Sequence, residues 1–284
     1  MRLRICLCTV LLSLSPIILY AQNHDNLQVR ELYTKSGMEK QFGELPSALQ
    51  VMFDQSALKD LQAQKLPRNV LSVMRASIPE AFAPEKLKEV MFAELAGKLT
   101  EQDIKEVLRW LDSPEGKKCT RLEEAASAPE AQAEQQQYAA LLRDSPPTAE
   151  RLKVLRELDS ALKVTESAVE ISINMQVALV LGMIATLPIE QQKQSDTVAR
   201  ELEKRRPELE AKVRSTMLIS DLYVYKNLTD AEIEQYTEFG KSPAGSAFSS
   251  VVNAAIKKAI NEGALRWGKL IGEAVKELKG KSEA

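Results

Sequence analysis

Apolar residues recur at every third or fourth position along most of this chain, which is the pattern of helices that bury one face. Ile104, Val107 and Leu111 show the spacing clearly. The alternation typical of strands is absent, as are Asn-Gly turns. The sequence therefore predicts an all-α fold, with helices over 27–36, 38–54, 55–65, 68–78, 85–97, 101–112, 114–126, 149–187, 189–205, 208–226, 230–240 and 243–262.

Local breakers mark the ends of several of these helices. The range 149–187 is long, so we expect a break or bend inside it. The Ala/Gln-rich centre of 127–150 suits a further helix, which the run Asp144-Ser145-Pro146-Pro147 would end. Gly263 predicts a left-handed cap after the helix over 243–262. The remaining 264–284 would then be a separate C-terminal helix or tail.

The first residues have the order of a secretory signal peptide. Arg2 and Arg4 precede an apolar run from Ile5 to Tyr20, and the small residue Ala21 comes before a polar stretch. The run is short for a membrane span and contains a proline. We therefore expect residues 1–21 to be removed, and the protein to be exported to the periplasm or secreted.

The charge balance argues against a nucleic-acid partner, and the cysteine content argues against an internal disulfide. The chain has 38 basic and 40 acidic residues, and losing the leader makes it more acidic. A chain with this balance has no general attraction for nucleic acid, so we expect no nucleic-acid partner. Two of the three cysteines lie in the leader, so Cys119 alone remains and no internal disulfide can form.

Two segments of the chain, 99–126 and 228–255, align without a gap and share a set of residues that shape the backbone. This repeat predicts an internal duplication, with helical-bundle repeats over 22–145 and 146–263. The shared motif consists of Thr100, Asp103, Trp110, Ser113, Pro114 and Gly116 in the first copy, and of Thr229, Glu232, Phe239, Ser242, Pro243 and Gly245 in the second.

Each copy of the motif predicts a helix, a sharp elbow and a second helix. Thr100 and Asp103 have the spacing of a capping box. Pro114 disfavours helical backbone at Ser113, which can then cap a new helix with proline in its first turn. Glycine at position 116 lowers helix propensity, so we expect another backbone, or the aromatic residue before the elbow, to approach it closely.

An anion bound at the N-terminus of the new helix is the functional alternative for the elbow. Lys117 and Lys118 favour an anion in the first copy, and Glu115 opposes it. The second copy has Ala244, Ser246 and Ala247 there and no positive charge. We therefore interpret the elbow as a structural joint.

The motif resembles a family of bacterial periplasmic domains of unknown function, whose pattern is a threonine-led acidic cap, a short helix and aromatic-x-x-Ser-Pro-x-Gly-x-Lys. Residues 99–118 fit this pattern well, and 228–247 fit it except that Ala247 replaces the lysine. The resemblance implies an exported α-helical domain. It brings no catalytic residues.

Reactive chemistry has little support, and we expect no catalytic residue, metal site or cofactor. His24 is the only histidine, no cysteine pair has zinc spacing, and no glycine-rich phosphate loop occurs. Cys119 reads as a buried, inert thiol. The acidic residues read as solvated helix faces, among them Glu123-Glu124 and Asp159. Glu166 and Glu170, one turn apart beside an apolar helix, are the candidate acid–base pair, although exposure is favoured there too.

Two apolar segments are candidates for contact with a membrane or with other protein. Residues 171–188 are the most apolar stretch after the leader, and we favour a buried central helix over membrane insertion. The 264–284 segment carries an apolar stripe with lysines, and we favour docking on protein over contact with a membrane surface.

Three functions follow. The first is a non-enzymatic exported protein that binds a partner or forms a self-associating scaffold. The second is a carrier of an apolar small molecule or lipid between the two halves, lined by Met175, Leu179, Val180 and Met183. The third is a cell-envelope hydrolase that uses Glu or Asp.

Overall fold

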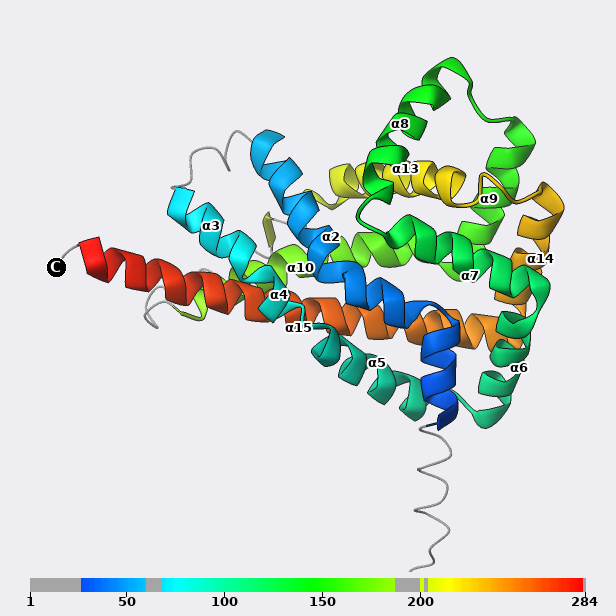
Figure 1. Ribbon diagram of the computed structural model, residues 1–284, viewed down its shortest axis with the longest axis horizontal. Helices are drawn as coiled ribbons and strands as arrows, with labels where there is room; N and C mark the ends of the chain where they lie inside the picture. The colour runs from blue at the N-terminus through cyan, green and yellow to red at the C-terminus, as the bar shows by residue number, and fades with distance from the viewer. Residues whose placement is uncertain (1–26, 60–67, 187–199, 202–203, 283–284) are drawn as a thin grey trace, which may run out of the picture.

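The computed structural model describes residues 27–59, 68–186, 200–201 and 204–282. The predicted leader, His24 and parts of the predicted helices over 55–65 and 189–205 lie outside the described residues. Within the described ranges all regular structure is helical (Figure 1), which confirms the all-α prediction. Residues 27–35 form the first helix. The next helices are α2 (Met38–Lys59), α3 (Arg68–Ala76), α4 (Ile78–Ala81), α5 (Pro84–Lys98), α6 (Glu101–Asp112), α7 (Pro114–Ser127), α8 (Ala131–Asp144), α9 (Ala149–Leu162), α10 (Val164–Ile184), α13 (Arg206–Val224), α14 (Asp230–Lys241) and α15 (Pro243–Ser282).

The expected break inside 149–187 occurs at Lys163, which separates α9 from α10. Lys163 adopts the left-handed conformation, with φ 56° and ψ 35°. One turn earlier, the Asp159 carboxylate accepts the Thr165 N–H at 2.7 Å. This contact satisfies a free amide in the first turn of α10 and fixes the bend.

The expected end of a helix at Gly263 is wrong, because α15 continues unbroken from Pro243 to Ser282. The 264–284 segment is therefore part of this helix as far as it is described. A side chain at Gly263 would overlap the ring of Phe82. The glycine permits close packing, and it does not cap the helix.

Helices α10 and α15 form the spine of the molecule and lie side by side (Figure 1). Their backbones meet at Gly182 and Gly268: a Cβ on Gly182 would overlap the Leu265 carbonyl oxygen, and one on Gly268 would overlap that of Leu179. A Cβ on Gly272 would likewise overlap the Thr186 side chain. Only glycine allows two helix backbones to approach this closely.

The helix predicted over 171–188 is only partly buried in the part that is described. Val169, Ile173 and Gly182 of α10 are buried, but most other side chains of this helix are half-buried. The burial is one-sided because α15 covers a single face. Among the described residues, α10 is the helix whose length and apolar composition match those of a membrane span.

The buried residues form two hydrophobic clusters, and neither is confined to one side of residue 146. The larger cluster combines α2, α4, α5 and α6 with Ala244, Ala255 and Ala259 of α15. The smaller one combines Cys119 of α7 with residues of α9, α13 and α14, including Ile233. The predicted ranges 22–145 and 146–263 therefore share their cores.

Local hydrogen bonds build the first elbow. Thr100 accepts the Asp103 N–H at 3.1 Å, and the Asp103 carboxylate accepts the Thr100 N–H at 3.1 Å, so the capping box is complete. Ser113 ends α6 and caps α7: its hydroxyl donates to the Trp110 carbonyl at 2.6 Å and accepts the Gly116 N–H at 3.0 Å. A Cβ on Gly116 would overlap that same carbonyl oxygen, which explains the glycine.

The second elbow has the same geometry. The capping box of Thr229 and Glu232 is complete, and Ser242 donates to the Phe239 carbonyl at 2.6 Å and accepts the Gly245 N–H at 3.1 Å. A Cβ on Gly245 would overlap the Phe239 carbonyl oxygen.

The aromatic rings of the two elbows stack on each other. The ring centroids of Trp110 and Phe239 are 4.7 Å apart, with 6° between the ring planes. Tyr236 stacks against Trp110 at 5.7 Å. The corners are thus joined face to face, which fixes α6 and α14 against each other.

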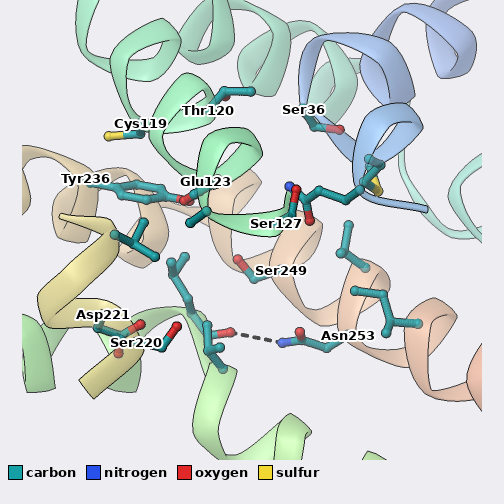
Figure 2. Close-up of a pocket in the computed structure, with 18 of the residues that line it drawn as sticks. Ser36, Cys119, Thr120, Glu123, Ser127, Ser220, Asp221, Tyr236, Ser249 and Asn253 are labelled. Carbon is teal, nitrogen blue, oxygen red and sulfur yellow. Dashed lines mark hydrogen bonds between the residues drawn. The ribbon is translucent and has the colours of Figure 1, made fainter. Parts of the chain in front are cut away.

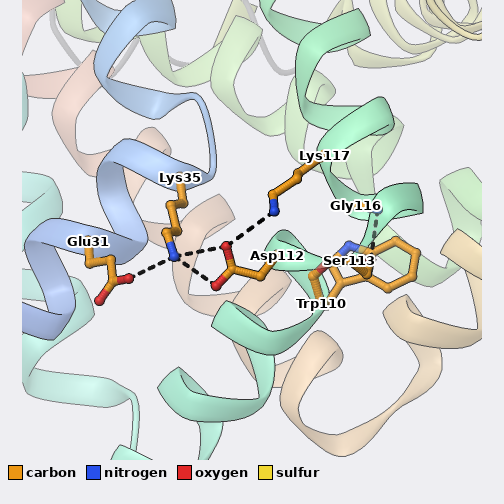
Figure 3. A network of polar contacts seen from close by, with 7 residues as sticks. All are labelled: Glu31, Lys35, Trp110, Asp112, Ser113, Gly116 and Lys117. Carbon is orange, nitrogen blue, oxygen red and sulfur yellow. Dashed lines mark hydrogen bonds and ion pairs between the residues drawn. The ribbon is translucent and has the colours of Figure 1, made fainter.

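Surface ion pairs tie the first described helix to the first elbow (Figure 3). Lys35 bonds both oxygens of Asp112, at 2.9 and 2.7 Å, and also pairs with Glu31. Lys117 lies 3.8 Å from Asp112 on the other side. These side chains are well exposed, so their contribution to stability is small.

Candidate functional site

A cavity of about 570 Å³ lies where α2, α6, α7, α13, α14 and α15 meet. Its walls are largely apolar. The elbow rings Trp110 and Phe239 line it, and they are joined by Met38, Phe42, Leu45, Leu111, Leu162, Val164, Met217, Val224, Phe248, Val252, Ile256 and Ile260. A concave, mostly apolar site of this size is typical of small-molecule pockets.

Polar side chains from several helices also line this cavity (Figure 2). Residues Cys119, Thr120, Glu123 and Ser127 share the inward face of α7, because they recur every three or four positions. Ser220 and Asp221 reach the cavity from α13. The remaining polar lining residues are Ser36, Gln41, Gln135, Tyr225, Tyr236, Ser249 and Asn253.

Glu123 is held by two tyrosines. The hydroxyls of Tyr225 and Tyr236 both donate to its Oε1 atom, at 2.8 and 3.1 Å. Desolvation raises the pKa of Glu123, although these two hydrogen bonds oppose the rise. Burial and the neighbouring carboxylate raise the pKa of both phenols well above the usual value, so they remain hydrogen-bond donors.

Asp221 is the second carboxyl group of the cavity. Burial raises its pKa to about 7, and the negative charges of Asp159 and Glu123 add to the rise. Among the described residues, the carboxylate has no hydrogen-bond or ion-pair partner. A carboxyl group of this kind in a cavity is a candidate functional group.

The wall that carries Tyr225 is fixed from outside the cavity by Arg151. The guanidinium group of this α9 residue donates to the Tyr225 carbonyl oxygen at 2.5 Å and to Asp230 Oδ1 at 2.7 Å. One side chain thus joins α9 to the end of α13 and the start of α14. Tyr225 is buried, with 7% of its surface exposed, so its hydroxyl is held in place for Glu123.

Cys119 is buried beside Glu123, as expected of an inert thiol. Burial, together with the negative charges of Glu123 and Glu232, raises its pKa to about 12. The nearby Lys118 only partly opposes this effect, and its ammonium group bonds Glu232 at 2.6 Å. A thiol with this pKa is a poor nucleophile.

The structure places the predicted site residues in three groups. Trp110, Gly116 and Phe239 line the cavity, so the elbows form part of its wall. The expected apolar lining, Met175, Leu179, Val180 and Met183, lies elsewhere on α10 and does not line this cavity. At Gly182 the backbone of α10 instead packs directly on α15.

The candidate acid–base pair also lies elsewhere. Glu166 is exposed, and Glu170 pairs with Arg206 at 3.0 Å. Neither residue lines the cavity.

Sequence reasoning missed Glu123 and Asp221. We expected Glu123 on a solvent face, but it lies four positions after Cys119, which we had already assigned inward. Helical periodicity could therefore have found it. Asp221 shares an inward stripe of α13 with Met217 and Val224, a pattern that gives a weaker signal.

Metal binding has no support in the described part of the chain, where no group of three or more His, Cys, Asp or Glu side chains could hold an ion. Two carboxyl groups alone fall short of the oxygen ligands that calcium or magnesium requires.

Comparison with known proteins gives one match. Residues 85–144 match the profile of a family described as uncharacterized proteins conserved in bacteria, DUF2059. The matched range covers α5 to α8 and includes the first elbow and Glu123. No curated protein and no solved structure matches the chain. The similarity is thus to a bacterial domain of unknown function.

Proposed function

We propose that this protein binds a small, largely apolar molecule in the cavity between α2, α7, α13, α14 and α15, and releases it unchanged. The cavity itself carries the proposal: about 570 Å³ of space with apolar and aromatic walls and polar side chains among them. This composition is what a pocket needs to bury a ligand and orient it. The function is that of the small-molecule carrier, with its site moved away from α10.

The scaffold hypothesis has weaker support. The large exposed apolar side chains of the described chain are Leu27, Met52, Leu141 and Leu265, and these lie on four different helical segments. Isolated apolar residues are normal on a protein surface. A partner would find no apolar patch built from them.

The hydrolase hypothesis also loses its basis. Glu166 and Glu170 lie outside the cavity, and the thiol of Cys119 has a raised pKa. Glu123 holds two tyrosine hydroxyls, whose own pKa values are raised. Binding without covalent chemistry therefore fits these groups best.

We also propose that the chain arose by duplication and is exported. Two observations support duplication: both elbows use the same serine and glycine hydrogen bonds, and their rings stack face to face. Support for export comes from the order of charges and apolar residues in 1–21. Sequencing the N-terminus of protein recovered from the periplasm tests export: a start near residue 22 is expected, and an intact Met1 would count against it.

A pair of tryptophan variants tests the binding function. Ser249 faces the cavity from α15, whereas its neighbour Ser250 is exposed. Ser249→Trp should fill the cavity, and Ser250→Trp places the same side chain in solvent. The probe is a neutral solvatochromic dye, whose fluorescence rises on entering an apolar site.

The expected result is a saturable rise with one dye per protein, weakened at least tenfold by Ser249→Trp and unchanged by Ser250→Trp. Circular dichroism must show that both variants remain folded. If the folded Ser249→Trp protein binds the dye as well as the unaltered protein does, the proposed site is wrong.

A further inference from the structure

The charges that line the cavity have one sign. Its described lining includes the carboxyl groups of Glu123 and Asp221, but no lysine, arginine or histidine. Lys118, whose charge lowers the pKa of the lining residue Cys119, is already bonded to Glu232. No protein cation among the described lining residues therefore balances the two carboxylates.

Both carboxyl groups also retain free hydrogen-bonding capacity. Tyr225 and Tyr236 both bond Oε1 of Glu123, so Oε2 has no hydrogen-bond donor among the described residues. Asp221 has no donor for either side-chain oxygen in the same part of the chain. Neither residue contributes a fully buried atom without a partner, so these oxygens are accessible from the cavity, where a positively charged ligand group can pair with them.

The aromatic walls suit a cation as well. Tyr236, Trp110 and Phe239 stack on one another, and all three line the cavity. The faces of such rings attract positively charged nitrogen. The apolar residues beyond them offer contact for a hydrocarbon body.

We propose that the ligand of this cavity is an organic cation: an amphipathic molecule whose protonated amine or quaternary ammonium group lies between Glu123 and Asp221, with its hydrocarbon part against the aromatic and aliphatic walls. This inference rests on the proposed binding function and specifies its ligand class. A metal ion is a poorer occupant because the site has only two carboxyl groups and an apolar surround. An anion would meet two like charges.

The proposal includes a dependence on pH, because the cation requires ionised carboxylates. Asp221 has a pKa of about 7, so it loses its charge as the pH falls below that value. The groups that influence it are negative or neutral. Asp159 on α9 and Glu123 on α7 act on Asp221, and Asp221 in turn acts on Tyr225 at the end of α13 and on Tyr236 on α14.

Three eight-carbon probes test the proposal by calorimetry on the exported, delipidated protein. They are octyltrimethylammonium, octanol and octanoate, which differ in charge but share a hydrocarbon chain. At about pH 8 the cation should bind at least tenfold more tightly than octanol, and octanoate should bind most weakly. The preference for the cation should shrink several-fold at about pH 5, since Asp221 is then protonated.

Matched variants assign the preference to these residues. Asp221→Asn and Glu123→Gln should each reduce binding of the cation about tenfold and leave octanol binding unchanged. Glu157→Gln removes one charge from an exposed position on α9 and should change neither. Binding of octanol shows that the cavity is intact, so a variant that misfolds is recognised because it binds neither octanol nor the cation. In that case the pH dependence of cation binding to the unaltered protein tests the proposal.

The outcomes separate this inference from the function on which it rests. Equal binding of octanol and the cation at about pH 8 overturns the cation assignment and leaves the binding function standing. Preference for octanoate overturns it as well. If no probe binds, and the neutral dye fails too, the binding function itself is refuted.

Discussion

Replacing Asp221 with asparagine removes a charge from the cavity while keeping the size of the side chain. In the ligand-free protein this carboxylate is buried, lies near Glu123 and Asp159, and has no partner among the described residues. We therefore expect Asp221→Asn to make the empty protein more stable at alkaline pH, which is unusual for a substitution in a buried site.

The size and sign of the effect follow from the pKa of Asp221. It is raised from 3.8 to about 7, so between these values the folded state holds a proton that the unfolded state has lost. The free energy of unfolding therefore falls as the pH rises through this window. The full shift of roughly three units corresponds to about 4 kcal/mol. The asparagine amide still loses hydration on burial, so we expect a gain of about 2 to 3 kcal/mol.

Urea denaturation followed by circular dichroism measures this gain. At about pH 8 the variant should unfold at higher urea than the unaltered protein. Near pH 4 this gain should be lost, because Asp221 is then neutral in the folded state and about half protonated in the unfolded state. Glu157→Gln, an exposed carboxylate on α9, is the control and should shift neither curve. Identical stability of Asp221→Asn and the unaltered protein at both pH values would refute the reasoning.

Three further predictions concern the elbows. Gly116→Ala should lower the free energy of unfolding by about 1 to 3 kcal/mol, because its Cβ would meet the Trp110 carbonyl; urea denaturation measures the loss. Gly43→Ala, in open space on α2, should instead raise it by up to about 1 kcal/mol. Equal effects of the two variants would contradict the packing argument. Thr100→Ala should cost about 1 kcal/mol by the same assay through loss of the capping box, and an unchanged midpoint would show that the cap is dispensable. Lys118→Ala should raise the pKa of Glu232 from about 2, while the Thr229 cap keeps it below 4.5. A carbon-detected NMR titration measures this pKa. An unchanged value would exclude the ion pair with Lys118 as the main cause of the low pKa.

The elbows could be predicted from the sequence because their determinants are local. A capping threonine, a Ser-Pro pair and a glycine act within one helical turn, and the structure shows the geometry that they predict. The helix over 131–144 was readable for the same reason, whereas the break inside 149–187 was expected from its length alone and its position at Lys163 was not predicted. The all-α fold followed from the spacing of apolar residues.

Features that depend on distant contacts could not be read in this way. Gly263 resembles a helix cap in sequence, and only its contact with Phe82 reveals its role. The stacking of Trp110 on Phe239 joins segments more than a hundred residues apart. The cavity depends on that same arrangement. The close contact of Gly182 on α10 with Gly268 on α15 depends in the same way on two distant segments.

The buried thiol of Cys119 offers a chemical probe of the cavity. It is the sole cysteine after residue 21, and 3% of its surface is exposed. Cys119 also lines the cavity, so a small thiol reagent reaches it through the proposed site. The rate of alkylation under native conditions therefore depends on whether the cavity is empty. Any molecule that fills the cavity should lower this rate, even when its chemical identity is unknown.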